Sequence, residues 1–453
     1  MSKIARALKA GGALFLCLQS LSIASAQSSP AMPGILPLER RAEVEDRWLA
    51  QRFETVLPTL MRRDNVKMWI LVAGEYNEDP IVETMLPATW LHARRRTILV
   101  YFDPGEGQPI ERLALARYAI GDFKPSWIPE DEPDQWAQLA KIVRERNPAT
   151  IALNRSEGFP LADGLSSTHY EAIVKALGPD LSRRLVAHER LGLGWLETRI
   201  PDEMASYPTI SRISHAIIEE GFSEKVITPG VTTSDDVVWW FRNRIAELKL
   251  DTWFQPSVAI QRPDGGQFSV QEMGHRGDTV IMPGDMLHVD FGITYLGLNT
   301  DIQRLAYVLK PGETDAPKGL RDGLAAMNRV RDATVAALKP GRTGNEVLAL
   351  ARRQIEAEKI EGTIYSHPIG HHGHGAGTWI GAWESQQPAP GRGEYRIDPN
   401  TAWSIELNAE HKVPEWGGQK VRFMHEEDGF LDANGQFRFL DGAQERFMLV
   451  PRP

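Results

Sequence analysis

The chain has very little cysteine and, after its first residues, no long hydrophobic run. Cys17 is the only cysteine among 453 residues, and it lies in a segment that we expect to be removed. The remaining chain then cannot form an internal disulfide or bind a metal through sulfur. No later stretch reaches about 18 uninterrupted apolar residues, so the sequence predicts no membrane-spanning helix.

Residues 1–26 have the pattern of a secretory signal peptide. Lys3, Arg6 and Lys9 precede an apolar run, and residues 24–26 read Ala-Ser-Ala, a typical cleavage site. We therefore predict an exported protein, periplasmic or secreted, with no membrane contact after cleavage. Loss of the three basic residues takes the formal net charge from −9 to −12. This acidic balance argues against nucleic acid as a main partner.

The first half of the mature chain alternates apolar strands with amphipathic helices. Residues 67–73, 96–102 and 149–154 have the character of buried strands, and residues 135–147 have helical spacing. Such alternation predicts an α/β layer domain, which we assign to residues 40–197. We find no convergent set of catalytic side chains in it.

Residues 198–453 contain two similar stretches. "PGVTTSDDVVWWFRNRIAEL" begins at Pro229, and "PGRTGNEVLALARRQIEAE" begins at Pro340. In both, Pro-Gly is followed by a threonine, an acid and an amphipathic helix, at an offset of about 111 residues. The pattern predicts an internal repeat whose two α/β halves face each other across a cleft. The alternative is that two unrelated helices both follow a Pro-Gly pair by coincidence.

Two aspartates lie in a predicted β-hairpin over residues 284–309, with Gly297 near its turn. Asp290 and Asp301 stand at similar distances from this turn on opposite arms, so they can share one surface. Close carboxylates repel each other unless one is protonated or a cation lies between them. The pair therefore indicates a cation site.

Further acids and histidines are available for such a site. Residues 401–410 and 421–431 are apolar β-like segments that contain acids, which are costly to bury unpaired. The loop "SHPIGHHGHGAG" (366–377) adds imidazoles. Oxygen and imidazole donors suit one or two divalent ions such as Mn²⁺, Co²⁺ or Zn²⁺, and the oxygen majority favours a hard metal, Mn²⁺ first. The candidates are Glu406, Glu426, Glu427, His367, His371 and His374.

At these residues the chain resembles the pita-bread metallopeptidases, which include methionine aminopeptidase, Xaa-Pro aminopeptidase, prolidase and the metal-free creatinase. "VDFGITYLGLNTDIQR" (289–304) matches their Asp, Gly, Tyr, Gly, Asp and Arg pattern, with a step of eleven residues from the first aspartate to the second. "GHGAG" (373–377) matches their Gly-His-x-x-Gly, and "SIELN" (404–408) stands at their first glutamate strand. The resemblance implies a creatinase-type α/β domain followed by an α+β pita-bread catalytic domain with an internal pseudo-twofold repeat.

The resemblance also implies a site and an activity: hydrolysis of an N-terminal Xaa-Pro peptide bond by an aminopeptidase or dipeptidase that uses two divalent metal ions. Glu406 would relay the proton, and His371 or His367 would hydrogen-bond the substrate carbonyl or the intermediate. An apolar substrate pocket would be lined by Trp253, Tyr295 and Trp383. The metal ligands carried over by position are Asp290, Asp301, His374, Glu406 and Glu427.

Departures from the family pattern leave two ligand assignments open. The family has a histidine seven residues after its ligand, but this step leads from His374 to Gly381 and from His371 to Thr378. His371 stays a rival ligand because "HPIGH" (367–371) resembles the His-Gly-x-Gly-His of prolidase. It lacks a glycine three residues on, so His374 is preferred.

The family's last glutamate follows Arg-x-Glu, and Arg422 is too far from Glu427 for that pattern, so Glu426 stays an alternative. A histidine expected about seventeen residues before Asp290 is replaced by Met273, with His275 only nearby.

Three other functions stay open. The same scaffold can carry another amide or C–N hydrolase, as creatinase shows. A relative that has lost catalysis can act as a peptide-binding module, and the histidine loop alone can scavenge metal. A homodimer is an open alternative to a monomer.

Overall fold

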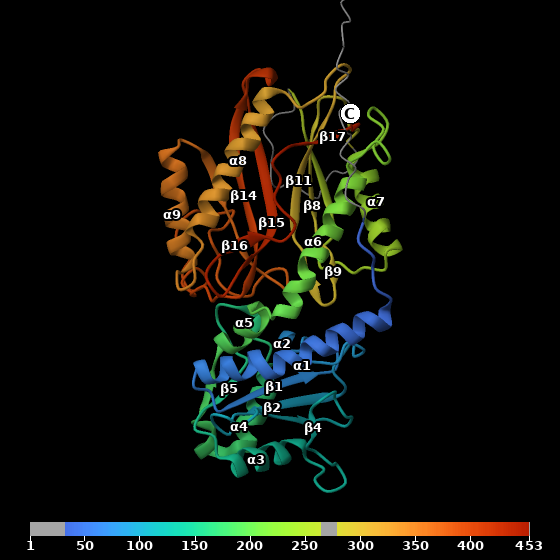
Figure 1. Cartoon of the computed structure of the whole chain (residues 1–453). Helices are drawn as coiled ribbons and strands as arrows, with labels where there is room; N and C mark the ends of the chain where they lie inside the picture. Colours follow the sequence, from blue (N-terminus) through green and yellow to red (C-terminus); the bar gives the residue numbers. More distant parts are fainter. Residues whose placement is uncertain (1–31, 264–278, 453) are drawn as a thin grey trace, which may run out of the picture.

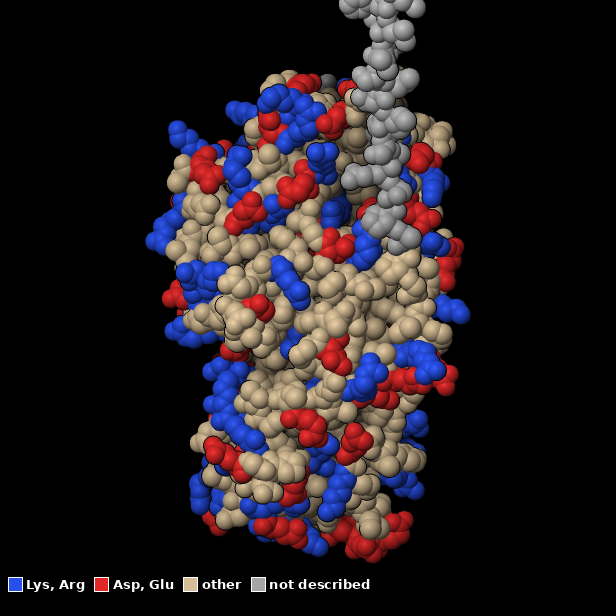
Figure 2. Space-filling model, in the orientation of Figure 1, with Lys and Arg blue, Asp and Glu red and all other residues tan. Residues whose placement is uncertain are grey.

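The computed structural model describes residues 32–263 and 279–452. These residues form one large sheet in each half of the chain (Figure 1), and a small two-stranded sheet lies in the C-terminal half. The predicted signal peptide, Met273 and His275 lie outside the described residues. Among the described residues, no helix combines the length and apolarity needed to cross a membrane. Acidic and basic side chains are interspersed over the face shown in Figure 2.

The N-terminal half is a mixed six-stranded sheet in the order β4-β3-β2-β1-β5-β6, with helices on both faces. Along β1, Met68 and Ile70 pack with α3 and α4, whereas Trp69 and Leu71 pack in the core shared with α1 and α5. Its elements are α1 (Leu38–Arg63), β1 (Met68–Gly74), α2 (Pro80–Glu83), β2 (Arg96–Phe102), β3 (Glu111–Leu115), β4 (Lys124–Pro125), α3 (Gln135–Arg146), β5 (Ile151–Leu153), η1 (Pro160–Ala162), α4 (Ser167–Ser182), β6 (Leu185–Ala187) and α5 (Glu189–Glu197).

The C-terminal half is a nine-stranded sheet whose main path runs β12-β14-β15-β11-β8-β7. The α-helices described in this half lie around it (Figure 1). Its elements are α6 (Pro201–Gly221), α7 (Ser234–Glu247), β7 (Ser257–Gln261), β8 (Met286–Phe291), β9 (Thr294–Tyr295), β10 (Leu298–Asn299), β11 (Ile302–Val308), α8 (Lys318–Ala337), α9 (Gly344–Ala357), β12 (Glu361–Ile364), β13 (His367–Ile369), β14 (Thr401–Val413), η3 (Pro414–Trp416), β15 (Gln419–Leu431), β16 (Phe437–Phe439) and β17 (Met448–Val450).

The second helix of each helix pair in this half begins in the same way. Thr233 and Thr343 each cap a 14-residue helix, α7 and α9, and in each case the acid at the third helical position closes a capping box. A glycine with a φ of 84° precedes each threonine, at Gly230 and Gly341. The predicted Pro-Gly, Thr, acid pattern is therefore a repeated local structure, which places α6–α7 and α8–α9 as corresponding helix pairs.

The large sheet buries its apolar face against these helices. On β14, Trp403, Ile405 and Leu407 belong to the core that α8 and α9 complete. Side chains alternate along a strand, so Ser404 and Glu406 point to the opposite face. The polar residues of the site lie on that second face.

The chain passes from the first sheet to the second between α5 and α6, while the domain limits 40–197 and 198–453 stay a prediction. Glu197, the last residue of α5, is buried there and accepts a hydrogen bond from the Tyr395 hydroxyl (3.0 Å). Burial and then the nearby Asp398 raise the pKa of Glu197 from 4.5 to about 8, against the opposing effects of Tyr395, Arg63 and Arg190. Its carboxyl is therefore neutral at pH 7.

We expect Glu197→Gln to weaken the pH dependence of folding stability. Because the folded-state pKa of Glu197 is raised, the folded chain binds the extra proton, and stability falls as pH rises from about 4.5 to about 8. The fall amounts to up to about 5 kcal/mol at about 1.4 kcal/mol per pKa unit. Urea unfolding at several pH values measures it, with exposed Glu106→Gln as control. Equal slopes in wild type and Glu197→Gln would contradict this assignment.

Candidate metal centre

Acidic side chains form a row across four neighbouring strands of the large sheet. In the strand register, Glu406 of β14 pairs with Glu426 of β15, Glu426 pairs with Gln303 of β11, and Gln303 pairs with Asp290 of β8. Directly paired residues point to the same face of a sheet. The row therefore presents three carboxylates and one amide on the face opposite the helices, and Asp301, just before β11, joins it.

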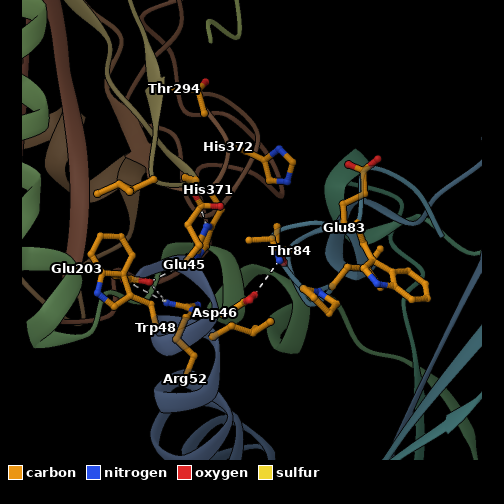
Figure 3. Close-up of a pocket in the computed structure, with 17 residues that line it drawn as sticks. Glu45, Asp46, Trp48, Arg52, Glu83, Thr84, Glu203, Thr294, His371 and His372 are labelled. Atoms are coloured by element: carbon orange, nitrogen blue, oxygen red, sulfur yellow. Dashed lines mark hydrogen bonds and ion pairs between the residues drawn. The ribbon is translucent and has the colours of Figure 1, made fainter. Parts of the chain in front are cut away.

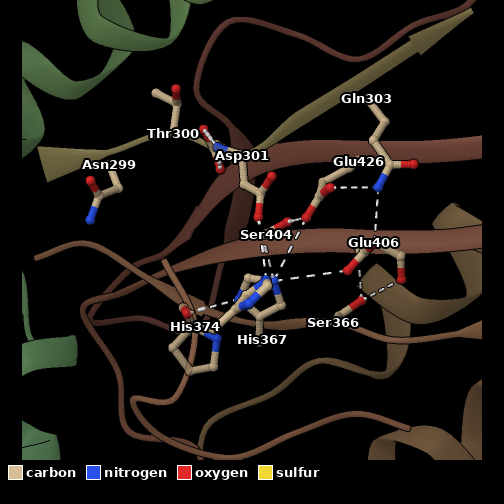
Figure 4. A network of polar contacts seen from close by, with 12 residues as sticks. Asn299, Thr300, Asp301, Gln303, Ser366, His367, His374, Ser404, Glu406 and Glu426 are labelled. Atoms are coloured by element: carbon tan, nitrogen blue, oxygen red, sulfur yellow. Dashed lines mark hydrogen bonds and ion pairs between the residues drawn. The ribbon is translucent and has the colours of Figure 1, made fainter. Parts of the chain in front are cut away.

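Two histidines of the loop 366–377 lie against this row (Figure 4). The Nε2 atom of His367 lies 3.7 Å from Glu426 Oε1, 3.8 Å from Asp301 Oδ2 and 4.0 Å from Glu406 Oε2. The Nε2 atom of His374 lies 3.7 Å from the same Asp301 oxygen. The side chain of His367 is 0% exposed and that of His374 is 51% exposed, so only His374 faces solvent substantially.

This arrangement fits divalent metal ions. Three overlapping groups have ligand atoms within 4.8 Å of one another: Asp301, His367 and His374; His367, Glu406 and Glu426; Asp290, Asp301 and Glu426. Within the described residues, the buried atoms Asp290 Oδ1 and His367 Nε2 have no hydrogen-bond partner. Buried polar atoms are normally paired, so these two suit ligand positions. Carboxylate oxygens with an imidazole nitrogen are donors for Mn²⁺, Co²⁺ or Zn²⁺.

The electrostatics of the acids show the same need for positive charge. Burial and then the charge of Glu426 raise the pKa values of Asp290, Asp301 and Glu406 well above their ordinary range. Burial also opposes ionisation of Glu426, but interactions with His367 and a hydrogen bond from Ser404 outweigh it and lower the pKa of Glu426. Without cations, this cluster holds protons or repels itself.

Neutral donors hold the glutamates in place. Gln303 donates from Nε2 to Glu406 Oε1 (2.9 Å) and Glu426 Oε2 (2.7 Å), and the Ser404 hydroxyl donates to Glu426 Oε1 (2.5 Å). The indole N–H of Trp383 also donates to Glu406. His288 Nε2 lies 2.8 Å from Gln303 Oε1, and burial lowers the pKa of His288 to about 4, so this ring is neutral.

The structure does not bring Glu427 to the cluster, which corrects the predicted ligand set in favour of Glu426. Glu427 pairs with Ile405 in the β14–β15 register, and Ile405 faces the helices. Its carboxylate lies 2.7 Å from Arg304 and 3.0 Å from His215 of α6. Adjacent residues of a strand point to opposite faces, so only one of the two acids can lie beside Glu406.

The roles predicted for the histidines also need correction. His371 lies away from the carboxylate row: its Nδ1 is 3.1 Å from the Gly297 carbonyl oxygen and its Nε2 is 3.6 Å from Glu203. His367, predicted to contact substrate, is instead the most enclosed imidazole of the site. Counted from His367, the family's seven-residue step leads to His374, so the family pattern is present with His367 at the ligand position.

Glycines allow this loop to pack closely. A Cβ atom at residue 373 would lie 2.4 Å from the Trp253 ring, and one at residue 377, where φ is 76°, would lie 2.2 Å from Glu197 Oε2. Both contacts are far shorter than a real Cβ atom permits. The glycines therefore seat the histidine loop between Trp253 and the end of α5.

Two of the three predicted pocket residues lie at the site. The rings of Trp253 and His374 meet edge to face with centroids 4.9 Å apart, and Trp383 contacts both Tyr365 and Glu406. Tyr295 does not take part: it is buried, its hydroxyl accepts from the Leu36 N–H (2.9 Å), and Arg41 lies over its ring. The turn at Leu296 and Gly297, both with positive φ, holds Tyr295 near the start of α1.

Sequence reasoning missed several polar residues that support the site. Gln303, Ser404 and Asp428 were not singled out, although each lies two residues from a candidate acid: Asp301, Glu406 and Glu426, respectively. Asp428 accepts the backbone N–H of Asp301 at 3.2 Å and fixes the start of β11. Period-2 spacing from each candidate acid was the signal that could have found them.

A separate cavity of about 300 Å³ lies between the two halves (Figure 3). Helix α1 contributes Trp48 and Arg52, and the histidine loop contributes His371 and His372. Arg52 pairs with Glu203 of α6 at 3.0 Å, which ties α1 to α6. Glu203 also faces His371, so His371 belongs to this contact between the halves.

Comparison with known proteins places the site in a family. Residues 208–426, which include every residue of the carboxylate row, match the model of metallopeptidase family M24. These residues therefore form a domain of the M24 peptidase type. A stretch of 249 residues is 28% identical to the uncharacterized peptidase YqhT of Bacillus subtilis. That match covers 51% of this chain and 65% of YqhT, which is less than two thirds of the relative's length.

Solved structures show the fold over both halves. The X-Pro aminopeptidase of Thermotoga maritima MSB8 is similar with a TM-score of 0.60 at 18% identity, over 86% of this chain and 100% of that one. The N-terminal domain of the FACT complex subunit SPT16 from Eremothecium gossypii is similar with a TM-score of 0.56 at 13% identity, over 92% and 100%. The predicted two-domain pita-bread fold is confirmed, and at these identities the likeness concerns the fold alone.

Proposed function

We propose that the protein is a metal-dependent aminopeptidase or dipeptidase that hydrolyses the N-terminal Xaa-Pro bond of peptides. The carboxylate row with one enclosed imidazole carries this proposal. Two divalent ions, Mn²⁺ first and Co²⁺ or Zn²⁺ as alternatives, would be held by Asp290, Asp301, His367, Glu406 and Glu426. Such ions supply Lewis-acid polarisation of a carbonyl and lower the pKa of water.

The residues around the row have distinct tasks in this proposal. Glu406 accepts a proton from the attacking water and passes it to the leaving nitrogen. His374, half exposed and edge-on to Trp253, hydrogen-bonds the substrate carbonyl oxygen as negative charge develops on it. Trp253 and Trp383 provide the apolar wall for the peptide. His371 has no task here, because it pairs with Glu203.

The alternatives differ in what they require of the same row. A peptide-binding relative without catalysis has no need of metal ligands, and the three overlapping groups of acids and imidazoles at this site favour an enzyme over it. A different amide or C–N hydrolase would use the same ions on another substrate, so only a substrate panel separates it from the Xaa-Pro enzyme.

The test combines metal analysis with a peptide panel. We expect the purified mature protein to take up about two Mn²⁺ per chain, as two-metal sites do, and to cleave Xaa-Pro peptides in preference to Xaa-Ala peptides. Removal of metal by a chelator should abolish cleavage, and Mn²⁺ should restore it. Asp290→Ala should lose metal and activity together. Unchanged metal content in this variant would refute the site, and cleavage of other amides only would refute the substrate.

We also propose that the protein is exported after cleavage of residues 1–26. N-terminal sequencing of protein recovered from the cell envelope and medium tests this, and a mature chain that begins at Gln27 is the expected result. Its assembly as a monomer or a homodimer is to be read from its mass in solution.

A further inference from the structure

A buried glutamine stands in the middle of the row of acids. Gln303 is 2% exposed and pairs in register with Glu426 on one side and Asp290 on the other. We propose that Gln303 is a positioning residue that aims the carboxylates of Glu406 and Glu426 at the metal ions, and that His288 sets the direction of its amide. This inference rests on the proposed function, since it assumes that the row binds divalent ions.

The hydrogen bonds of Gln303 divide the oxygens of both glutamates. Its amide nitrogen has two N–H groups, and it lies within hydrogen-bond distance of Glu406 Oε1 (2.9 Å) and Glu426 Oε2 (2.7 Å). The other two oxygens, Glu406 Oε2 and Glu426 Oε1, are the ones that face His367 (Figure 4). Each glutamate thus has one oxygen held by the amide and one turned toward the ligand nitrogen.

His288 gives the amide its direction. Its Nε2 lies 2.8 Å from Gln303 Oε1, and both side chains are buried. An amide oxygen only accepts hydrogen bonds, so Nε2 carries the proton and donates it. Rotation of the amide by half a turn would place its oxygen against two carboxylates and its N–H groups against another N–H. The His288 bond therefore favours the orientation in which Gln303 donates to both glutamates.

The charge of the cluster explains why an amide suits this position. An acid here would add a carboxylate to the four of Asp290, Asp301, Glu406 and Glu426, and an apolar residue would leave two carboxylate oxygens without donors. Loss of a buried donor costs the full desolvation of its partner. Residues that hydrogen-bond metal ligands typically increase metal affinity by about 10- to 100-fold.

Calorimetric titration with Mn²⁺ tests the proposal without relying on activity. We expect Gln303→Met, which keeps the length of the side chain without its donors, to bind Mn²⁺ about 10- to 100-fold more weakly than wild type. His288→Leu should weaken binding in the same direction, and His288→Gln, which keeps an N–H donor, should recover part of the loss. Gln444→Met is the matched control, because Gln444 is also buried but bonds only backbone atoms of Leu305 and Arg446.

The outcomes separate this inference from the proposed function. Wild-type protein that takes up no Mn²⁺ would overturn both. Mn²⁺ affinity in Gln303→Met equal to wild type would overturn the inference alone and leave the metal site standing. Urea unfolding of the metal-free proteins supplies the second measurement: a merely structural glutamine would lower stability in Gln303→Met and Gln444→Met alike and leave Mn²⁺ affinity unchanged in both.

Discussion

Replacement of Glu426 by glutamine is expected to lower peptidase activity by more than about 100-fold. This loss exceeds the roughly 10- to 100-fold effect of removing a residue that only hydrogen-bonds a metal ligand. Glu426 lies in two of the three ligand groups, and its Oε1 faces His367. An amide there removes the negative charge that binds the ions and places N–H groups beside the remaining acids. Mn²⁺ titration and kcat/KM on an Xaa-Pro peptide measure the loss.

Glu427→Gln is the matched control, since it makes the same change one residue further along β15. Its carboxylate faces Arg304 and His215 on the helix side of the sheet. We expect Mn²⁺ affinity to stay near that of wild type, while stability falls by at most the roughly 3–5 kcal/mol that a broken buried ion pair costs. Loss of Mn²⁺ binding in Glu427→Gln with full binding in Glu426→Gln would refute the register argument.

Most helices and strands could be predicted from the sequence, because each leaves its own periodic spacing of apolar residues. Residues 96–102 and 135–147 were expected as strand and helix, and the structure has β2 at Arg96–Phe102 and α3 at Gln135–Arg146. The hairpin that carries Asp290 and Asp301 and the long strands around Glu406 and Glu426 also lie where apolar alternation put them. Burial of alternate side chains leaves a trace in the sequence of each strand.

The choice between Glu426 and Glu427 could not follow from such patterns. Both acids lie within one apolar segment, and which one shares a face with Glu406 depends on the register between β14 and β15. A shift of one residue would exchange the two. That register results from packing of Ile405 and Phe423 against the helices, which is a long-range property.

The histidine loop was difficult for a different reason. It has little regular structure beyond the short strand β13, so no periodicity tells which imidazole points inward. A motif match placed the ligand at His374, although the seven-residue step from His367 was also present in the sequence. Tyr295 was misplaced because a two-residue turn with positive φ carries its ring away from the site.

The sequence predicted His374 as a metal ligand and His367 as a substrate contact, whereas the proposed function assigns the two residues the opposite roles. The second large expected effect follows from this assignment. We expect His367→Ala to lose Mn²⁺ binding and to lower activity by more than about 100-fold, because removal of a metal ligand should lower activity more than removal of a residue that hydrogen-bonds a ligand. Its Nε2 is fully buried, lies within 4.0 Å of three carboxylates and has no hydrogen-bond partner among the described residues. An alanine there removes the enclosed imidazole nitrogen that faces these three carboxylates. His367→Gln, which fills more of the space, separates loss of the ligand from loss of packing.

His374→Ala should behave differently, because His374 is 51% exposed and approaches only Asp301 among the acids. We expect it to keep its Mn²⁺ stoichiometry and to lose about 10²- to 10³-fold in kcat, the usual cost of a donor to a developing oxyanion. His372→Ala is the control from the same loop, since His372 lines the cavity between the halves. If His374→Ala lost one Mn²⁺ per chain while His367→Ala kept both, His374 would be the ligand and the buried imidazole a support. The two variants therefore decide which histidine binds metal and which meets the substrate.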